Sequence, residues 1–536
     1  MTAEQTPGAV ETWVVRKPAV HAAGGLVASQ HYRASDIGAR VLANDGNAVD
    51  AAVAAGMAIG TVEPWMSGLG GGGFMLIYLA AQRRVHAIDF LMRAPQGLDP
   101  ADYPLGKGTD ADLFGWPAVH EGRNVVGPFS FAVPGFVAGL ALALERFGSR
   151  SWAESLAPAI ELARKGLAVD WYATLKIAAA APALASFPDS ARIYLPQGFV
   201  PAGQWGGPLP HIKLGNLDHT LEQLARAGPG DFYRGEIASA LVTDASRAGS
   251  TLSSADLGEY RATVLSPDVM TYRGARVHTA PGLTAGPTLR HALSMLEHRL
   301  APGAAPGAQA YSAYAACFLD AYEQRLARMG EGDEGGASSC TTHLSVVDRQ
   351  GNMVALTQTL LSVFGSKVVL PQTGVLMNNG IMWFDPRPGR PNSIGPGKRP
   401  LSNMCPTIVE RDDNLRVALG TSGGRRIMPA VCQLISFLLD FDMTIDQACH
   451  QPRIDVSGTP LVRVDERLAA DIIAALASEH EVATALHGVY PALYACPNIV
   501  ARDDARGVST GGAYVMSPWA KVSAQDEPRT HPEKGS

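Results

Sequence analysis

The chain has 536 residues, of which 46% are hydrophobic and 18% charged, a composition typical of globular proteins with a large core. Its net charge of -6 and the lack of a Lys/Arg run argue against a nucleic-acid partner. No apolar run reaches the roughly 18 residues that span a bilayer, and the first residues lack the apolar core of a signal peptide. We therefore expect a cytoplasmic protein without a membrane partner.

The six cysteines form no C-x-x-C pair and lie far apart in the sequence. A zinc site needs cysteines or histidines clustered at short spacing, and only Cys449 and His450 are neighbours. The sequence therefore predicts free thiols, no metal site and no cofactor.

In the first part of the chain, alanine-rich patterns predict helices, and residues 1–20 are expected to be a tail. Asn44, Asp45 and Gly46 form a turn signal that divides residues 35–60 into two helices. A glycine-rich loop then leads into a strand. The segments expected to be regular are 74–79 as a strand, and 137–147, 152–165 and 221–227 as helices.

The pattern changes after two flexible stretches, residues 300–309 and 330–339. Residues 341–348 alternate like a strand, residues 349–352 form a turn, and residues 353–360 form a second strand, which together predict a β-hairpin. Later segments are expected to be a strand at 416–420, a helix from about Ile427, and a polar tail at 518–536.

The hairpin brings two threonines together at its open end. If it closes symmetrically about Gln350, facing residue numbers sum to about 700, and Thr359 lies opposite Thr341. A threonine that begins a strand after a flexible linker fits an N-terminal nucleophile. Once the bond after Cys340 is cut, the free α-amine, with a pKa of about 8, can take the proton of the Thr341 hydroxyl. The pattern also fits ordinary strand threonines, which β-branching favours.

Ser422 is a second candidate nucleophile, because residues 420–424 fit G-x-S-x-G between a strand and a helix. Asp471, His480 and His487 follow it, so the chain order Ser, Asp, His is available. The same turn fits a glycine-rich loop whose backbone N–H groups bind negative charge at the start of a helix. The pattern alone leaves both candidates open.

Short motifs follow one another from about Ala22 to Val456, at 46–54, 68–73, 133–135, 232–235, 341–343, 345–348, 351–352, 398–402, 406–409 and 423–424. In this order they resemble the γ-glutamyltranspeptidase family of N-terminal-nucleophile hydrolases. The resemblance implies an α+β fold, a four-layer αββα sandwich. It also implies a zymogen that cuts itself autocatalytically into a large chain, 1–340, and a small chain, 341–536. The two fragments would form a heterodimer within one αββα unit, and a dimer of such heterodimers is a further expectation.

The resemblance also assigns the catalytic residues. Thr341 matches the family nucleophile, and Thr359 matches the hydroxyl that supports it. Gly423 and Gly424 match the backbone donors of the oxyanion hole, so that Ser422 is not the nucleophile. Cys340 precedes the cut and would itself be the nucleophile if cleavage fell one residue earlier.

The positions expected to bind the acyl donor depart from the family pattern. Leu91 stands where the family has an arginine that binds the substrate α-carboxylate, and Arg93 lies two residues further on. Leu361 replaces an asparagine. Gly380 and Trp383 replace the glutamine and aspartate that read the α-amino group. The replacements make the expected pocket apolar, unless Arg93 and another acid compensate from new positions.

Of two serines in the family pattern, Ser402 is kept and Asn403 replaces the second. A zwitterionic glutamyl head needs charged partners once it is desolvated, and these positions no longer supply them. The segment 385–398 is also shorter than in members that carry a lid, and its prolines stiffen it, which predicts an open cleft.

The sequence therefore predicts an N-terminal-threonine amide hydrolase or acyltransferase that acts on a small-molecule amide with a non-glutamyl or otherwise altered acyl group, with hydrolysis favoured over transfer. Cephalosporin acylases, glutaryl acylases and hydrolases of small amides are relatives of this kind, and the sequence does not choose among them. Three alternatives are a true γ-glutamyltransferase or glutathione hydrolase, a serine hydrolase that uses Ser422, and a binding protein that stays one uncut chain.

Overall fold

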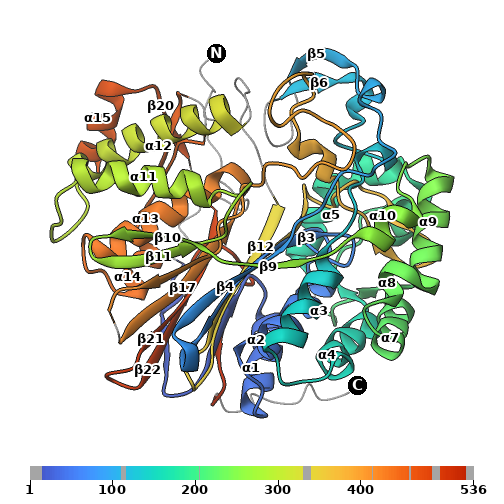
Figure 1. The fold of residues 1–536 in the computed structure, drawn as a ribbon, viewed down its shortest axis with the longest axis horizontal. Helices are drawn as coiled ribbons and strands as arrows, with labels where there is room; N and C mark the ends of the chain where they lie inside the picture. The colour runs from blue at the N-terminus through green and yellow to red at the C-terminus, as the bar shows by residue number, and fades with distance from the viewer. Residues whose placement is uncertain are drawn as a thin grey trace.

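The computed structural model describes residues 15–109, 116–204, 206–329, 340–412, 414–457, 460–485 and 495–526. Within these residues, two large β-sheets face each other, and helices cover the outer face of each sheet (Figure 1). The predicted four-layer αββα sandwich of the α+β class is confirmed. The predicted linker 330–339 and most of both predicted tails lie outside the described residues.

One sheet carries the predicted hairpin and lies at the centre of the molecule. In its order across the sheet, the strands are β23 (Lys521–Ala524), β2 (Leu26–Ser29), β12 (Cys340–Val347), β13 (Met353–Leu361), β3 (Gly72–Leu79), β4 (Arg84–Phe90) and β9 (Thr263–Leu265). All neighbouring strands pair antiparallel. β13 is buried along its whole length, because it has a strand on each side, the second sheet on one face and helix α2 on the other.

The second sheet packs against the first. Its strands, in order, are β1 (Val20–Ala22), β22 (Val508–Ala513), β21 (Cys496–Asp503), β17 (Leu415–Ser422), β16 (Thr407–Glu410), β11 (Ala275–Thr279) and β10 (Asp268–Tyr272). Apolar side chains such as Ala355, Val347, Ile408 and Ala418 fill the space between the two sheets.

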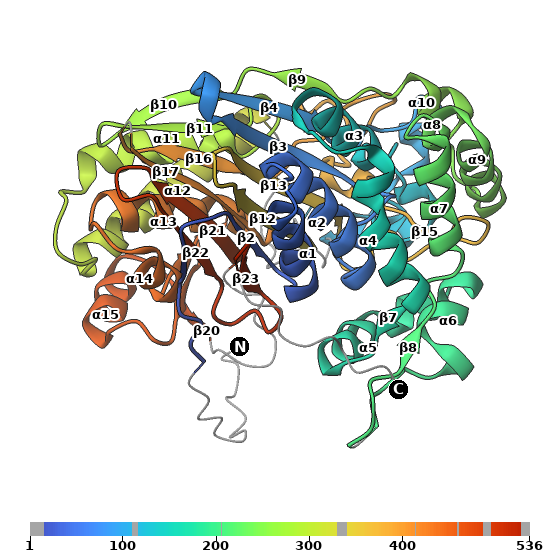
Figure 2. The same ribbon diagram turned by 90° about the horizontal axis from the view of Figure 1, so that it is seen from below.

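Helices form the two outer layers (Figures 1 and 2). Against the hairpin sheet and beyond it lie α1 (Tyr32–Ala43), α2 (Ala48–Val62), α3 (Phe136–Phe147), α4 (Trp152–Lys165), α5 (Trp171–Ala185), α6 (Pro188–Tyr194), α7 (Leu217–Ala227), α8 (Asp231–Arg234), α9 (Glu236–Ala248) and α10 (Ser254–Glu259). The opposite layer consists of α11 (Gly286–Arg299), α12 (Ala308–Met329), α13 (Ile427–Leu439), α14 (Ile445–His450) and α15 (Ala470–Glu479).

The helix boundaries follow local signals in the sequence. A capping box of Asn47 and Asp50 begins α2, and one of Ser151 and Glu154 begins α4. Every residue of α2 is buried, because its alanines and glycines allow it to lie flat against the sheet.

Smaller elements connect these layers. They are the strand pairs β5 (Leu105–Thr109) with β6 (Pro117–Val119), β7 (Leu167–Ala168) with β8 (His211–Ile212), and β14 (Val369–Leu370) with β15 (Val375–Leu376), and the three strands β18 (Ile454–Asp455), β19 (Val462–Asp465) and β20 (Val482–Ala485).

The predicted C-terminal tail is wrong over its first residues, and so is the end of the predicted N-terminal tail. β23 is an edge strand in which Lys521 pairs with Ser29, and Val20 begins β1. The ammonium of Lys17 donates hydrogen bonds to the carbonyl oxygens of Ser517 and Ala520. The two ends of the described chain therefore form part of the sandwich instead of projecting from it.

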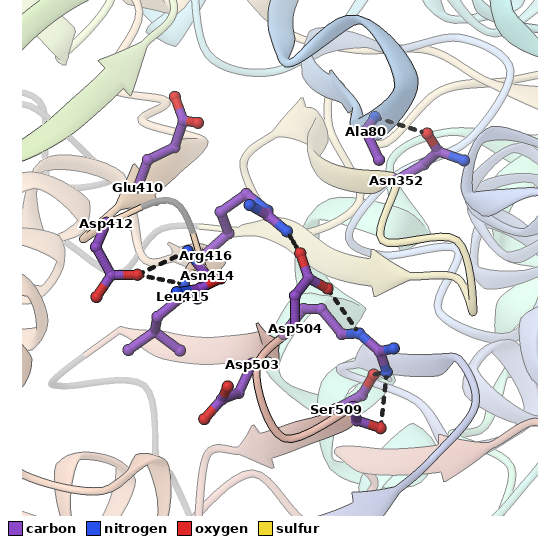
Figure 3. A network of polar contacts seen from close by, with 12 residues as sticks. Ala80, Asn352, Glu410, Asp412, Asn414, Leu415, Arg416, Asp503, Asp504 and Ser509 are labelled. Atoms are coloured by element: carbon purple, nitrogen blue, oxygen red, sulfur yellow. Dashed lines mark hydrogen bonds and ion pairs between the residues drawn. The ribbon is translucent and has the colours of Figure 1, made fainter.

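Polar contacts tie together the loops of each sheet at the turn end of the hairpin (Figure 3), which lies about 20 Å along β12 from Thr341. The Arg416 guanidinium crosses between the sheets and lies 5.0 Å from the ring centre of Tyr78. Asn352 accepts a hydrogen bond of 2.9 Å from the backbone of Ala80, and the Arg416 guanidinium forms an ion pair with Asp504. Arg502 also donates to Asp504, at 3.2 Å. This network fixes the end of the sandwich that is remote from the predicted site.

Two further features concern the part of the chain that the structure describes. None of its helices combines the length and the apolarity that a bilayer crossing requires. It also contains no group of three or more His, Cys, Asp or Glu side chains arranged to hold a metal ion.

Candidate active site

The hairpin has the register that the sequence predicts. Thr342 pairs with Gln358, His343 with Thr357, and the pairing continues to Val347 with Met353, so facing residue numbers sum to 700. The register shifts at the open end, where the backbone of Cys340 pairs with Leu361. Thr341 therefore lies at an irregularity of the strand, where a β-bulge can redirect a side chain.

Thr341 and Thr359 lie together at this open end. The Thr341 hydroxyl oxygen is 3.5 Å from that of Thr359, at the outer limit of a hydrogen bond, and both side chains are buried. Catalytic hydrogen bonds are often long before a substrate binds. Thr359 also accepts a hydrogen bond of 2.8 Å from the backbone N–H of Leu361, which holds its hydroxyl in place.

Leu361 has an unusual backbone conformation. Its φ of 86° lies in the left-handed region, which costs a residue with a Cβ about 1–2 kcal/mol. Asparagine, which the resemblance implies for the family at this position, tolerates this region better than leucine. The strain turns the chain at the end of β13 and directs the Leu361 N–H to Thr359.

A buried histidine connects the hairpin to the second sheet. The His343 ring hydrogen-bonds the hydroxyls of Thr357 at 2.8 Å and Ser345 at 3.0 Å, and Ser345 in turn donates to the carbonyl oxygen of Asn498. Burial lowers the pKa of His343 to about 3, so the ring is neutral. Its Nε2–H therefore donates to Ser345, and its Nδ1 accepts from Thr357.

The same ring positions the glycine-rich turn near Thr341. A Cβ at Gly420 would lie 2.3 Å from His343, so only glycine allows this contact between β17 and β12. At the other end of the strands, a Cβ on Gly351 in the hairpin turn would lie 3.9 Å from the Arg416 guanidinium, so β12 and β17 run in opposite directions. The end of β17 and the turn at Gly423 therefore lie toward the Thr341 end of the hairpin.

Gly423 and Gly424 begin the turn before α13. Their φ values of 141° and 58° are accessible mainly to glycine, and a Cβ on Gly423 would meet Ala495 at 2.8 Å. The next residue, Arg425, is buried with its guanidinium 5.4 Å from the ring centre of Trp116, and its carbonyl accepts a hydrogen bond from Tyr322. The turn is thus held rigidly before chemistry begins.

Ser422 has different surroundings from those of a triad serine. It is the last residue of β17, pairs with Cys496 and hydrogen-bonds its thiol. Asp471 and His480 belong to α15 and its end, which packs on α12 in the outer helical layer (Figure 1). His487, the third residue of that hypothesis, lies outside the described residues.

The structure brings the predicted donor residues Leu91, Leu361 and Trp383 into one apolar cluster beside the threonines, together with Phe74, Met92 and Trp116. Gly380 begins the short 3-10 helix Gly380–Trp383, and a Cβ there would meet Ala132 at 2.7 Å. Asn392 donates a hydrogen bond of 2.7 Å to the Trp383 carbonyl. The segment 385–398 thus folds back and contacts this wall of the site.

Arg93 follows the apolar cluster in sequence and is half-buried. Its backbone pairs with Val133. Its side-chain Nε and Nη2 are buried and have no hydrogen-bond partner among the described residues. A buried guanidinium nitrogen without a partner costs about 1–3 kcal/mol, and more because it is charged. An anion bound here would remove that cost.

The predicted residues Ser402 and Asn403 are positioned by an arginine that the sequence analysis missed. Arg325 is 4% exposed and donates to the Ser402 carbonyl at 2.7 Å and the Asn403 side chain at 3.1 Å. It also donates to the Thr284 carbonyl at 2.9 Å. In the sequence it follows Glu323 and Gln324 in α12, a polar run that resembles a solvent-exposed face.

Comparison with known proteins matches the family model "Gamma-glutamyltranspeptidase" to residues 34–338 and 330–504. The acylase ACY 1 proenzyme of Pseudomonas sp. (strain V22) is 34% identical over 513 residues, covering 87% of this chain and 88% of its own. The glutathione hydrolase proenzyme of Escherichia coli (strain K12) is 31% identical over 513 residues, covering 85% of each chain.

Among solved structures, a cephalosporin acylase from Bacillus halodurans has the same fold. It superimposes with a TM-score of 0.82 at 23% sequence identity, over 98% of this chain and 99% of that one. The family model, the relatives and the fold agree with one another. The chain belongs to the γ-glutamyltranspeptidase family of N-terminal-nucleophile hydrolases and is an amide hydrolase or acyltransferase of that family.

Proposed function

We propose that the chain is a proenzyme that cuts itself between Cys340 and Thr341 and then uses Thr341 as its nucleophile. In the first step, the Thr341 hydroxyl oxygen attacks the carbonyl carbon of Cys340. The peptide C–N bond breaks, an ester forms, and the freed amine takes a proton. Water hydrolyses the ester, which leaves a carboxylate on Cys340 and a free α-amine on Thr341. The relatives named proenzymes support this order of events.

The same atoms then act on the substrate. The neutral α-amine of Thr341 takes the hydroxyl proton as the oxygen attacks the amide carbonyl. Backbone N–H groups at Gly423 and Gly424 stabilise the oxyanion. The amine returns the proton to the leaving nitrogen, and water or an acceptor amine releases the acyl group. The observation that carries the proposal is the 3.5 Å contact of Thr341 with Thr359 at the hairpin's open end.

The acyl donor is proposed to lack the α-amino acid head of a glutamyl group. The positions Leu91, Leu361 and Trp383 present apolar side chains in one cluster beside the threonines. A desolvated ammonium or carboxylate against such a wall costs several kcal/mol without a partner. An acyl chain with an apolar or aromatic body fits the same surface.

The heterodimer is also part of the proposal. Strands from both predicted fragments alternate in each sheet: β12 and β13 lie between β2 and β3, and β16 pairs with β11. Hydrogen-bond ladders would therefore hold the fragments together after the cut. The cytoplasmic location stays a prediction.

A panel of p-nitroanilides that differ only in the acyl group tests this function. Phenylacetyl, hexanoyl and γ-glutamyl p-nitroanilides are offered to the wild type, Thr341→Ala and Ser422→Ala. We expect the wild type and Ser422→Ala to release p-nitroaniline from the first two compounds, and Thr341→Ala to release none. Activity that survives Thr341→Ala but not Ser422→Ala would identify Ser422, and not Thr341, as the nucleophile. Turnover of the γ-glutamyl compound alone would show that the acyl donor is a glutamyl group.

The unpartnered nitrogens of Arg93 favour a second donor class, an acyl group whose far end carries a carboxylate. A bidentate contact between guanidinium and carboxylate would pair them. Adding a succinyl p-nitroanilide to the panel tests it. Arg93→Ala should lower kcat/KM for that compound about tenfold or more and leave the hexanoyl compound unchanged, with Arg93→Lys between the two. Equal effects on both compounds would assign Arg93 a structural role.

A further inference from the structure

At the sheet end that carries Thr341, different residues lie on the two sides of β12. Leu361 ends β13 and Leu91 follows β4, so the apolar donor cluster lies in one direction across the sheet from β12. In the other direction, Tyr32 follows β2, and Trp519 precedes β23. The strands that lead to these two residues lie one and two positions away from β12, and neighbouring strands are about 4.8 Å apart.

The backbone register fixes this placement. Ser29 pairs with Leu344 on one side and with Lys521 on the other. One residue farther toward the site, the side-chain oxygen of Gln30 accepts a hydrogen bond of 3.1 Å from the His343 N–H. The pairing of β2 ends at Ser29, and Tyr32 begins α1 two residues after Gln30, so Tyr32 lies at the sheet end that carries Thr341.

Aromatic rings gather on this second side. The ring centres of Tyr32 and Trp519 are 6.1 Å apart at an interplanar angle of 63°. Those of Trp519 and Trp171, the first residue of α5, are also 6.1 Å apart, at 51°. Trp171 is 49% exposed, and Tyr32 and Trp519 are half-buried. Tryptophan is large and on average highly buried, so the exposed half of the Trp171 indole is a surface that a ligand ring can contact.

An amide has two halves, and an acyl-transfer site needs a place for each. The acyl half lies on the side of the donor cluster, toward β13 and β4. The amine half, whether it leaves or attacks as an acceptor, must lie on the other side of the Thr341 hydroxyl. That side is the aromatic face formed by Tyr32, Trp171 and Trp519.

We propose that this aromatic face binds the amine half of the substrate and that this half is a flat aromatic amine. Offset or edge-to-face contacts with the two indoles would hold its ring, and the proposal rests on the proposed function of Thr341. Trp171 then acts as a specificity residue for the leaving group and for acceptor amines. It has no part in the bond-making steps, so self-cleavage does not depend on it.

Two amides of one acid test the proposal. The acyl group is the best donor of the p-nitroanilide panel, and it is joined either to p-nitroaniline or to n-butylamine. kcat/KM reports acylation for both compounds, whatever limits kcat. Trp171→Ala should lower kcat/KM for the anilide about five- to tenfold and that for the butylamide by less than about twofold. Trp171→Phe, which keeps a ring, should retain most of the anilide activity.

Val269→Ala serves as the matched control, because Val269 is a 50% exposed apolar residue on β10, in the other sheet. It should change neither compound. Complete self-cleavage of Trp171→Ala, measured by mass, would show that the variant folds. Equal losses for both amides, or no loss for either, would overturn the proposed aromatic face.

A binding measurement tests this proposal independently of the proposed role of Thr341 as nucleophile. Saturation-transfer NMR with p-nitroaniline and with n-butylamine needs no turnover. The wild type should give a signal for p-nitroaniline alone, and Trp171→Ala should lose most of it. If the wild type cleaves no amide at all, the proposed function fails. The NMR measurement still shows whether the aromatic face binds an aromatic amine. An unchanged p-nitroaniline signal in Trp171→Ala would then reject it.

Discussion

Replacing Thr359 by valine removes one hydroxyl and nearly preserves the shape of the side chain. The Leu361 N–H loses the acceptor that now lies at 2.8 Å, in a site where Thr359 is fully buried. Leaving a buried N–H without this partner costs about 1–3 kcal/mol of unfolding free energy. For 536 residues the entropy of unfolding is about 1.1 kcal/mol/K, so Tm should fall by only about 1–3 °C.

The effect on chemistry should be much larger than the effect on stability. Thr359 lies 3.5 Å from the Thr341 hydroxyl and fixes its direction. A misplacement of about 1 Å can cost about a hundredfold in rate. We therefore expect the half-time of self-cleavage, followed by gel densitometry from the start of refolding, to lengthen about a hundredfold in Thr359→Val.

Thr359→Ser is the matched control, because it keeps the oxygen and loses one methyl group. Its half-time of self-cleavage should stay within about fivefold of the wild type. The lost methyl group should lower the free energy of unfolding by roughly 1 kcal/mol. If Thr359→Val cleaves itself as fast as Thr359→Ser, the hydroxyl does not support Thr341, and the assigned role of Thr359 is wrong.

Three further predictions concern groups around the site. Gly420→Ala should cost about 1–3 kcal/mol and slow self-cleavage, because the new Cβ would lie 2.3 Å from the His343 ring. Arg325→Met should lower the free energy of unfolding by about 2–4 kcal/mol, measured in urea, because the carbonyl oxygens of Thr284 and Ser402 lose their donor. It should also lower kcat/KM for hexanoyl p-nitroanilide. Glu63→Gln should stabilise the protein more at pH 8 than at pH 5, because burial raises the pKa of Glu63 to about 8.

The sign of the Glu63 effect follows from linkage. Its pKa is about 8 in the folded protein, above its ordinary value of 4.5, so the stability it contributes is complete below pH 4.5 and is lost as the pH rises to about 8. Glutamine does not titrate, and the difference between variant and wild type in urea unfolding should grow over that window. A difference that is constant between pH 5 and pH 8 would show that Glu63 is ionised in the fold.

The other two predictions have their own controls. Gly258→Ala in α10 introduces a methyl group with no atom within 4 Å, so it should not destabilise as Gly420→Ala does. Arg325→Lys keeps a cation that can reach part of the same oxygens, and it should fall between the wild type and Arg325→Met. Equal urea midpoints for Arg325→Met and the wild type would contradict the role given to this arginine.

Much of the hairpin and its register could be predicted, because the signals there are local. Residues 341–361 alternate, turn once and alternate again, and the structure has the expected pairing up to the shift at Cys340. The two helices expected within residues 35–60 and the helix expected at 152–165 are present as α1, α2 and α4. Thr341 and Thr359 follow directly from this register, and their roles stay predictions.

Features that depend on distant segments could not be predicted. The sequence predicts a tail where β23 lies, because its partner β2 is almost the whole chain away and four residues show too little alternation to indicate a strand alone. The aromatic face has the same origin, since Tyr32, Trp171 and Trp519 come from three remote segments. Arg325 could not be recognised as a buried residue, because its partners lie in loops near 284 and 402.

The central claim is that Thr341 becomes the N-terminal nucleophile by cutting the chain before it, and intact mass spectrometry tests it most directly. The wild type should give two fragments of about 35 and 20 kDa, with the smaller beginning at Thr341, and Thr341→Ala should stay at the full 56.4 kDa. A wild-type protein that remains a single chain, or a Thr341→Ala protein that is cut at the same bond, would contradict it.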